Sequence, residues 1–236
     1  SERIRFVEDR DGDGRADHAV TFAEGFNTMA DGTAAGVLAH QGSVWFANIP
    51  NLWLLRDTNA DGKADVRKAV HSGFGVRFAY TGHDLHGLCL GPDGKLYFSM
   101  GDRGLHVETE GRVVSAPDMG SVLRCNLDGS DLEFFAVGVR NPQELAFDKY
   151  GNLWTGDNNA DIGDRSRLVY VMEGGDSGWR IGYQHMPGGG PWITEQLWQR
   201  DAPAPYLVPP VGYVANGPAG LAYYPGTGLP DRYKDH

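Results

Sequence analysis

The amino-acid sequence predicts an all-β fold in which one unit of short strands is repeated along the chain. An acidic loop occurs twice, at residues 9–17 (DRDGDGRAD) and 57–65 (DTNADGKAD), and the second copy begins 48 residues after the first. A Gly-Phe pair follows each copy at the same spacing, at residues 25–26 and 73–74. A repeat of this length between strand-rich segments has the size of one blade of a β-propeller, a ring of four-stranded sheets.

Strand-like runs bounded by turn residues follow in order along the sequence. They occupy residues 44–47, 52–55, 88–90, 96–98, 122–124, 132–135, 153–155 and 168–172. Three turns share one pattern, in which Gly42, Gly94 or Gly151 precedes an aromatic strand. Because glycine adopts the positive φ that closes a tight turn, each of these sites predicts a hairpin within a blade. No stretch has the periodicity of an amphipathic helix.

These anchors predict a single domain over residues 1–236. It would contain half a blade, about three full blades and the first strand of a further blade at residues 220–224. Propellers usually close with more sheets, so we expect the chain to form part of a longer ring. Residues 186–210 are rich in glycine and proline and are expected to form a long loop, a type of segment that often carries function.

The composition disfavours several classes of partner. The formal net charge is −10 and there is no block of Lys or Arg, so nucleic acid and anionic membranes are poor partners. No apolar run approaches the length that spans a bilayer. Cys89 and Cys125 lie in apolar segments outside any CxxC motif, which predicts two buried thiols rather than a disulfide, a zinc ribbon or a covalent haem.

Both acidic loops carry side-chain oxygens at positions 1, 3, 5 and 9 and glycine at position 6, which matches most of a calcium-binding loop. Val20 and Lys68 stand where an EF-hand has its Glu, and no flanking helices are predicted, so the loops are not EF-hands. A calcium-binding hairpin loop with a structural role is one interpretation, and a solvated turn is the other. The candidate ligands are Asp9, Asp11, Asp13 and Asp17 in the first loop and Asp57, Asn59, Asp61 and Asp65 in the second.

Two further motifs carry a family resemblance, residues 83–104 (HDLHGLCLGPDGKLYFSMGDRG) and 138–147 (GVRNPQELAF). They resemble the central motifs of the soluble glucose/sorbosone dehydrogenases, six-bladed propellers that use pyrroloquinoline quinone (PQQ). The paired acidic loops resemble those of a related group, the membrane-bound dehydrogenases, in which such a propeller precedes other domains, often a haem domain. The resemblance extends from about residue 38 to residue 179.

The resemblance implies that a sugar or related alcohol loses a hydride to PQQ. His83 would act as general base, a task that suits an imidazole titrating near neutral pH. Arg140 would contact the quinone and stabilise its charge on reduction. Asn141 and Gln143 would help to hold the cofactor or its loop.

A calcium ion next to the quinone is also implied, where it would act as a Lewis acid. The matching stretch offers Asp157, Asn158 and Asn159 as candidates. The sequence departs from the family pattern at Gly82, which replaces an Asp, and at residues 85–86, which replace a glycine pair. His86 is therefore either a second functional imidazole or a competitor for the role of His83. The basic residues that clamp the quinone in later blades of the family would lie beyond residue 236.

The expected partners are a small-molecule sugar or alcohol substrate and a haem domain or cytochrome as electron acceptor, in a periplasmic or otherwise extracytoplasmic compartment. Two other functions stay open. One is a non-catalytic, calcium-stabilised propeller that binds glycan or protein, since a fold does not determine a function. The other is a lactonase-like, metal-dependent hydrolase, for which Asn141, Asp157 and Asn158 could supply ligands to a central calcium.

Overall fold

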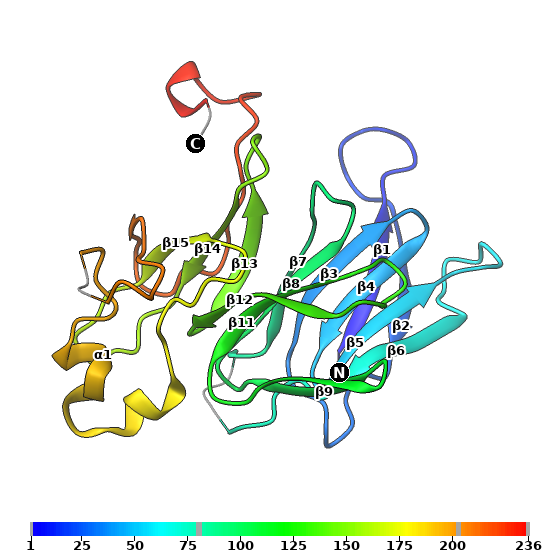
Figure 1. Cartoon of the computed structure of the whole chain (residues 1–236). Helices are drawn as coiled ribbons and strands as arrows, with labels where there is room; N and C mark the ends of the chain where they lie inside the picture. The colour runs from blue at the N-terminus through cyan, green and yellow to red at the C-terminus, as the bar shows by residue number, and fades with distance from the viewer. Residues whose placement is uncertain (1, 79–81, 202–203, 235–236) are drawn as a thin grey trace.

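Three antiparallel four-stranded sheets dominate the computed structural model, which describes residues 2–78, 82–201 and 204–234 (Figure 1). The first sheet contains β3 (Ala34–His40), β4 (Ser43–Asn48), β5 (Asn51–Arg56) and β6 (Val66–Ser72). The second contains β7 (Leu85–Leu90), β8 (Leu96–Met100), β11 (Gly120–Cys125) and β12 (Glu133–Val139). The third contains β13 (Pro142–Phe147), β14 (Leu153–Asp157), β15 (Arg167–Val171) and β16 (Gly212–Tyr213). These sheets confirm the prediction of an all-β fold with four-stranded blades.

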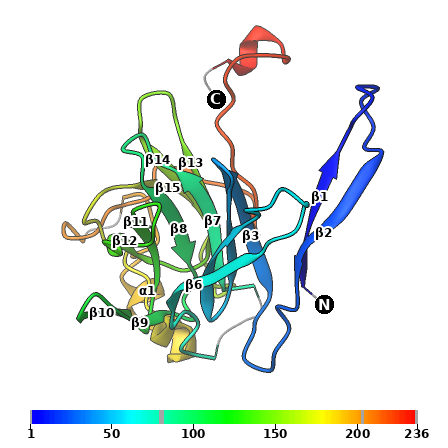
Figure 2. The same ribbon diagram turned by 90° about the vertical axis from the view of Figure 1, so that its right-hand side faces the viewer.

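The first strands of the three sheets lie next to one another, with β7 between β3 and β13 (Figure 2). A Cβ at Gly36 of β3 would lie 3.5 Å from the side chain of Leu88, and a Cβ at Gly87 of β7 would lie 3.1 Å from the side chain of Leu145 in β13. The three inner strands therefore line up in chain order, as the inner strands of successive propeller blades do.

The remaining strands form two separate hairpins. β1 (Arg3–Glu8) pairs with β2 (His18–Glu24), and the first acidic loop joins them as the second joins β5 and β6. The β1–β2 hairpin thus corresponds to the outer half of a blade, and the amide of Ala64 in the second acidic loop donates to the carbonyl of Phe22, 2.8 Å away. The hairpin of β9 (Leu105–Thr109) and β10 (Arg112–Ala116) was not predicted.

Side chains that alternate along the second sheet build two separate cores. Phe98 and Leu123 face the first sheet and pack in one cluster with Trp45. Their chain neighbours Tyr97 and Val122 point to the opposite face and pack against the third sheet. Because successive strand residues point to opposite faces, one sheet with apolar residues on both sides joins its two neighbours.

Beyond these sheets the structure differs from one sequence expectation. Residues 220–224 form no strand, because no described segment supplies the hydrogen-bonded neighbour that a strand requires. The segment expected to be a long loop, residues 186–210, contains two short helical turns, η2 (Pro187–Gly189) and α1 (Gly190–Thr194), and no strand in its described residues. η1 (Ile181–His185) precedes this segment, and η3 (Asp231–Tyr233) lies near the C-terminus. None of the helices in the described ranges has the length and hydropathy needed to cross a membrane.

Neither cysteine forms a disulfide: Cys125 is buried and Cys89 is half-buried. Burial raises the pKa of each thiol to about 12.

A buried histidine joins the first two sheets. His71 of β6 lies with its Nε2 2.7 Å from the carbonyl oxygen of Gly129, in the turn between β11 and β12. Burial lowers the pKa of His71 below its ordinary value of 6.5, because the charged imidazole loses its hydration.

This lowered pKa predicts a loss of stability in mild acid. Below pH 6.5 the unfolded chain takes up a proton at His71 that the folded chain does not, so the free energy of unfolding falls as the pH decreases. We expect His71→Gln to show a smaller fall between pH 7.5 and 5.5 than the wild type in urea unfolding. Exposed His106→Gln is the control and should keep the wild-type fall. An unchanged pH dependence in His71→Gln would contradict the assignment.

Candidate active site

The predicted site residues lie at one edge of the sheets. His83 stands just before β7 and Arg140 just before β13. Asp102 follows β8, whose end pairs with the start of β7, and Asp157 ends β14, where it pairs with Pro142 at the start of β13. Antiparallel pairing therefore places all four residues at the same edge of their blades.

The carboxylate of Asp102 bonds both to His83, the candidate base, and to Trp179, which lies far along the sequence. Nδ1 of His83 lies 2.7 Å from Oδ1 of Asp102, and the indole Nε1 of Trp179 donates to Oδ2 of the same carboxylate over 2.9 Å. All three side chains are buried. Gly101 makes this approach possible, because a Cβ at that position would lie 2.7 Å from the carbonyl carbon of His83.

Arg140 belongs to the same cluster. Its carbonyl oxygen accepts a hydrogen bond of 2.8 Å from the amide of Asp102, and its guanidinium carbon lies 5.5 Å from the ring centroid of Trp179. Nη1 donates to the carbonyl of Asn159 over 2.7 Å and Nη2 to the side chain of Gln184 over 3.2 Å. His83 and Arg140 thus share Asp102 as a neighbour, and Trp179 contacts both Asp102 and Arg140.

The side chain of Asp157 positions the backbone at Arg140. Oδ1 accepts from the amides of Arg140 and Asn141, over 2.8 and 2.9 Å. Oδ2 forms a buried ion pair with Arg167, whose guanidinium carbon lies 4.7 Å from the ring centroid of Trp192. Both carboxylate oxygens are therefore engaged within the protein, and a direct role of Asp157 in holding a cofactor or calcium stays a prediction.

The other predicted cofactor residues differ in their surroundings. Asn158 accepts from the amide of Gly217 over 3.3 Å, and Asn159 donates to Asp161 over 2.8 Å. Gln143 lies 3.5 Å from the carbonyl of Gly82, at the limit of a hydrogen bond. The side chain of Asn141 is buried, and its Oδ1 has no hydrogen-bond partner among the described residues. Of this set, Asn141 alone offers a buried acceptor that the described chain does not satisfy.

The two candidate imidazoles have different environments. Nε2 of His86 lies 2.8 Å from the carbonyl of Gly82 and 3.1 Å from the amide of Asp84, so backbone atoms hold this ring. Burial lowers the pKa of His86 below 6.5. His83 instead faces the carboxylate of Asp102, the arrangement that orients a histidine for proton transfer.

Sequence reasoning missed three members of the cluster. Asp102, Trp179 and Gln184 receive no role from the sequence alone. Asp102 could have been found, because it follows β8 in the same motif as His83 and antiparallel pairing brings the two together. No local signal marks Trp179, which lies 77 residues from its partner Asp102.

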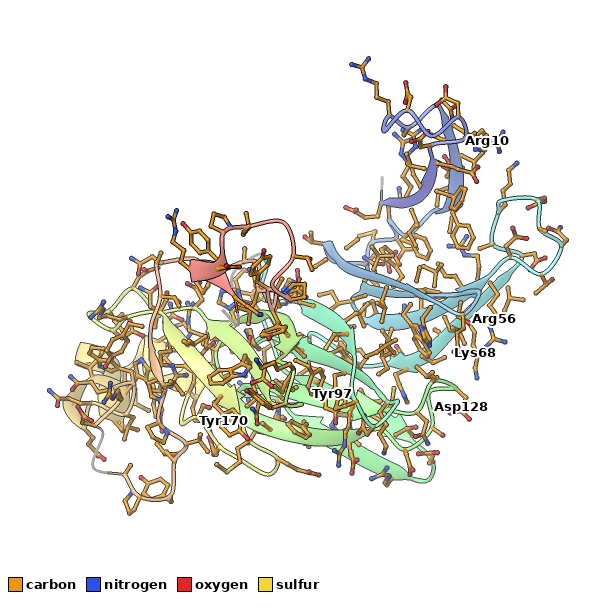
Figure 3. The ribbon with its side chains drawn as sticks, turned by 90° about the horizontal axis from the view of Figure 1, so that it is seen from above. Arg10, Arg56, Lys68, Tyr97, Asp128 and Tyr170 are labelled. Atoms are coloured by element: carbon orange, nitrogen blue, oxygen red, sulfur yellow. The ribbon has the colours of Figure 1, made fainter. Side chains whose placement is uncertain are left out.

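The acidic loops lie at the opposite edge of the sheets. The site is at the edge where β3 and β7 begin, whereas the second acidic loop follows the far end of β5. Figure 3 shows Arg10 in the first acidic loop and Arg56 and Lys68 beside the second, apart from Tyr97 and Tyr170 of the other two sheets.

The first loop brings three of its four predicted ligands together. Carboxylate oxygens of Asp9, Asp11 and Asp13 lie within 4.8 Å of one another. The amides of Gly14 and Gly12 donate to Asp9 and lower its pKa. Asp17 instead accepts from the amide of Arg10 over 3.1 Å and closes the loop.

The second loop is held in a similar way. Asp57 accepts from the amide of Gly62 over 2.8 Å, and Asp65 accepts from the hydroxyl of Thr58 over 2.7 Å. Asn59 donates to Asp61 over 3.3 Å.

The Asp157 network predicts a large effect on stability. Asp157→Ala would leave Arg167 buried without its carboxylate and two backbone amides without an acceptor. Removing one partner of a buried ion pair costs about 3–5 kcal/mol, so we expect a loss of this size in the free energy of unfolding from urea titration. Asp201→Ala, at a side chain that is 93% exposed, is the control and should change little. A loss below about 1 kcal/mol in Asp157→Ala would contradict the network.

Known proteins resemble the chain over part of their length. It is 31% identical over 125 residues to quinoprotein glucose dehydrogenase B of Acinetobacter calcoaceticus, and this match covers 41% of the chain and 26% of that protein. The chain therefore spans much less than two thirds of this curated relative.

Solved structures share the fold. An oxidoreductase described as a glucose dehydrogenase, from Thermus thermophilus, superposes with a TM-score of 0.65 at 20% identity, covering 95% of this chain and 68% of that one. The PQQ-bound aldose sugar dehydrogenase of Streptomyces coelicolor gives a TM-score of 0.61 at 18% identity, covering 89% of this chain and 63% of that one. At such identities the likeness shows the fold alone.

The described sheets and these structures together confirm the resemblance stated from the sequence: the chain has the fold of PQQ-dependent sugar dehydrogenases, seen over part of the propeller. Residues 1–177 match the family described as a domain of unknown function, DUF7133, and the chain belongs to that family.

Proposed function

We propose that this chain supplies the general base, His83, and a positively charged side chain, Arg140, of a quinoprotein-type dehydrogenase that oxidises a sugar or related alcohol. The observation that carries the proposal is the buried His83–Asp102 pair, which shares its surroundings with Arg140 at one edge of the sheets. The quinoprotein relative and the fold of the aldose and glucose dehydrogenases support an oxidoreductase of the glucose/aldose dehydrogenase type.

The residues present suit an anionic quinone. Arg140 is buried, and it is followed in the chain by Asn141, whose buried Oδ1 has no hydrogen-bond partner among the described residues. Arg140, Asn141 and Gln143 would hold the group, with Asn141 accepting from it or from an accompanying calcium ion. PQQ, when bound, would supply the hydride acceptor.

The chain's own residues would handle the proton and the charge. His83 would take the hydroxyl proton of the substrate on Nε2 while the carbon loses its hydride, so that an alcohol becomes a carbonyl group. Asp102 would keep the other nitrogen, Nδ1, protonated and would stabilise the imidazolium that forms. Arg140, held by Asn159 and Gln184, would present a fixed positive charge where negative charge develops.

A hydrolase is less well supported. A lactonase-like site would need several oxygen ligands converging on one metal, yet Asp157 bonds to two amides and Arg167, and Asn158 bonds to Gly217. Of the three ligands considered for this function, Asn141 alone retains an unsatisfied oxygen in the described chain.

The first test measures PQQ binding and turnover in the full-length protein. We titrate PQQ with calcium present, follow the quinone absorbance and then add a panel of aldoses. We expect His83→Gln to bind PQQ like the wild type and to oxidise sugar at least about 100-fold more slowly, the usual contribution of a general base. Asp102→Asn should also slow turnover.

Exposed His106→Gln is the matched control and should retain full activity. Sugar oxidation that survives in His83→Gln would reject the base assignment. Absence of PQQ binding in the wild type would reject the quinoprotein proposal and favour a recognition propeller.

We also propose that calcium binds the first acidic loop and stabilises the β1–β2 hairpin, because three carboxylates there supply clustered hard oxygens. A ligand at about 100 times its Kd stabilises the folded state by about 2.7 kcal/mol, so calcium should raise the melting temperature and a chelator should lower it. Asp11→Asn should weaken this response and Asp231→Asn, outside the loops, should not. An equal calcium response in Asp11→Asn and the wild type would exclude binding at this loop.

The remaining partners follow from the motifs that the chain resembles. The electrons would pass to a haem domain or a cytochrome, and the compartment would be periplasmic or otherwise extracytoplasmic.

A further inference from the structure

A buried carboxylate next to the candidate base has no part in the proposed function. Asp84 follows His83 in the chain and is 1% exposed, although burying a carboxylate is unfavourable unless it is paired. Its Oδ1 accepts from Nη1 of Arg103 over 2.7 Å, and its Oδ2 is buried without a hydrogen-bond partner among the described residues. The guanidinium of Arg103 therefore supplies the counter-charge of Asp84.

Two consecutive pairs of side chains link the same two segments. His83 bonds to Asp102 over 2.7 Å, and the next residue of each segment contributes to the ion pair of Asp84 with Arg103. The carbonyl oxygen of Asp84 also accepts from the amide of Gly101 over 3.0 Å. The backbone before β7 is thus tied to the backbone after β8 at the candidate base and again one residue later.

Arg103 holds a third segment as well. Its carbonyl oxygen accepts from the amide of Arg77 over 2.8 Å, and its Nε donates to the carbonyl of Arg77 over 3.3 Å. The side chain of Arg103 is 24% exposed, so the guanidinium contacts the buried carboxylate and still reaches solvent. One cation therefore joins the segment around Arg77 to the two segments that carry His83 and Asp102.

Loss of this ion pair would act on His83 through the backbone. A buried carboxylate without its cation is strongly destabilised, so the segment that carries Asp84 would shift to bring the charge to water. His83 lies one peptide bond away and would shift with it. A general base must lie within hydrogen-bond reach of the proton that it takes, and a displacement of about 1 Å lowers a rate by about 100-fold.

We propose that Asp84 and Arg103 are positioning residues that keep His83 aligned with Asp102. The inference rests on the proposed function, in which His83 is the general base, and it adds a second charged pair on which that base depends.

The first test observes His83 by NMR in the full-length protein with isotope-labelled histidine. The proton on Nδ1, hydrogen-bonded to Asp102, should give a downfield resonance that is assigned by its loss in His83→Gln. We expect Arg103→Gln and Asp84→Asn each to shift or abolish this resonance. Asp84→Asn keeps the shape of the side chain and removes the buried charge, so it tests the pair even where Arg103→Gln folds poorly.

A conservative variant and a matched control accompany these changes. The contact with Asp84 uses one nitrogen of Arg103, so Arg103→Lys can replace it and should retain the resonance. Arg124 forms an ion pair of 2.7 Å with Glu133 in the same sheet, at the opposite edge from the candidate site. Arg124→Gln should leave the resonance unchanged, whatever its effect on the melting temperature.

The second test measures kcat and KM separately on the PQQ-loaded protein. Misalignment of a base weakens binding of the transition state and leaves binding of the substrate intact. Arg103→Gln and Asp84→Asn should therefore lower kcat by about 10- to 100-fold with KM unchanged, and Arg103→Lys should keep most of the wild-type kcat. Arg124→Gln should keep all of it.

An unchanged His83 resonance in both Arg103→Gln and Asp84→Asn would overturn the positioning role. An equal change in Arg124→Gln would also overturn it, because the effect would then be general destabilisation, and so would a loss in Arg103→Lys as large as in Arg103→Gln. If the wild type oxidises no sugar, the proposed function fails while the resonance still decides the positioning role, because that measurement needs neither PQQ nor substrate.

Discussion

The carboxylate of Asp102 is the interaction on which the arrangement of the candidate site depends. It contacts His83 before β7 and Trp179 after β15, and its own amide bonds to Arg140 before β13. Three segments distant in sequence thus converge on one residue at the end of β8. Its desolvation is offset by two hydrogen bonds to the carboxylate, and the buried imidazole has a counter-charge available if it becomes protonated.

Much of the fold could be predicted because its signals are local. The turn glycines Gly42, Gly94 and Gly151 each precede a strand that the structure contains, and the repeated acidic loop marks corresponding hairpins. The juxtaposition of His83 and Arg140 could be anticipated from a strand-end position in adjacent blades. The contacts of Trp179 and the hydrogen bonds to both carboxylate oxygens of Asp157 could not be predicted from the sequence, because they depend on how distant segments pack.

The molecule separates its acidic loops from its candidate chemistry. Calcium at Asp9, Asp11 and Asp13 would act on an exposed hairpin, whereas the His83–Arg140 cluster is buried at the other edge of the sheets. Between the two edges lies the second sheet, whose two apolar faces join its neighbours. A metal at the loops would therefore influence the site through the rigidity of the packed sheets rather than through direct charge, because screening at physiological ionic strength weakens interactions beyond roughly 8 Å.

The buried thiols have a consequence for redox chemistry. Oxidation of a cysteine proceeds through the thiolate, and with a pKa of about 12 roughly one thiol in 10⁵ is ionised at pH 7 for Cys89 and Cys125 alike. Burial therefore disfavours the form of each sulfur that attacks peroxide or a disulfide. The packing that builds the cores of the second and third sheets thus also favours the less reactive thiol form of both sulfur atoms.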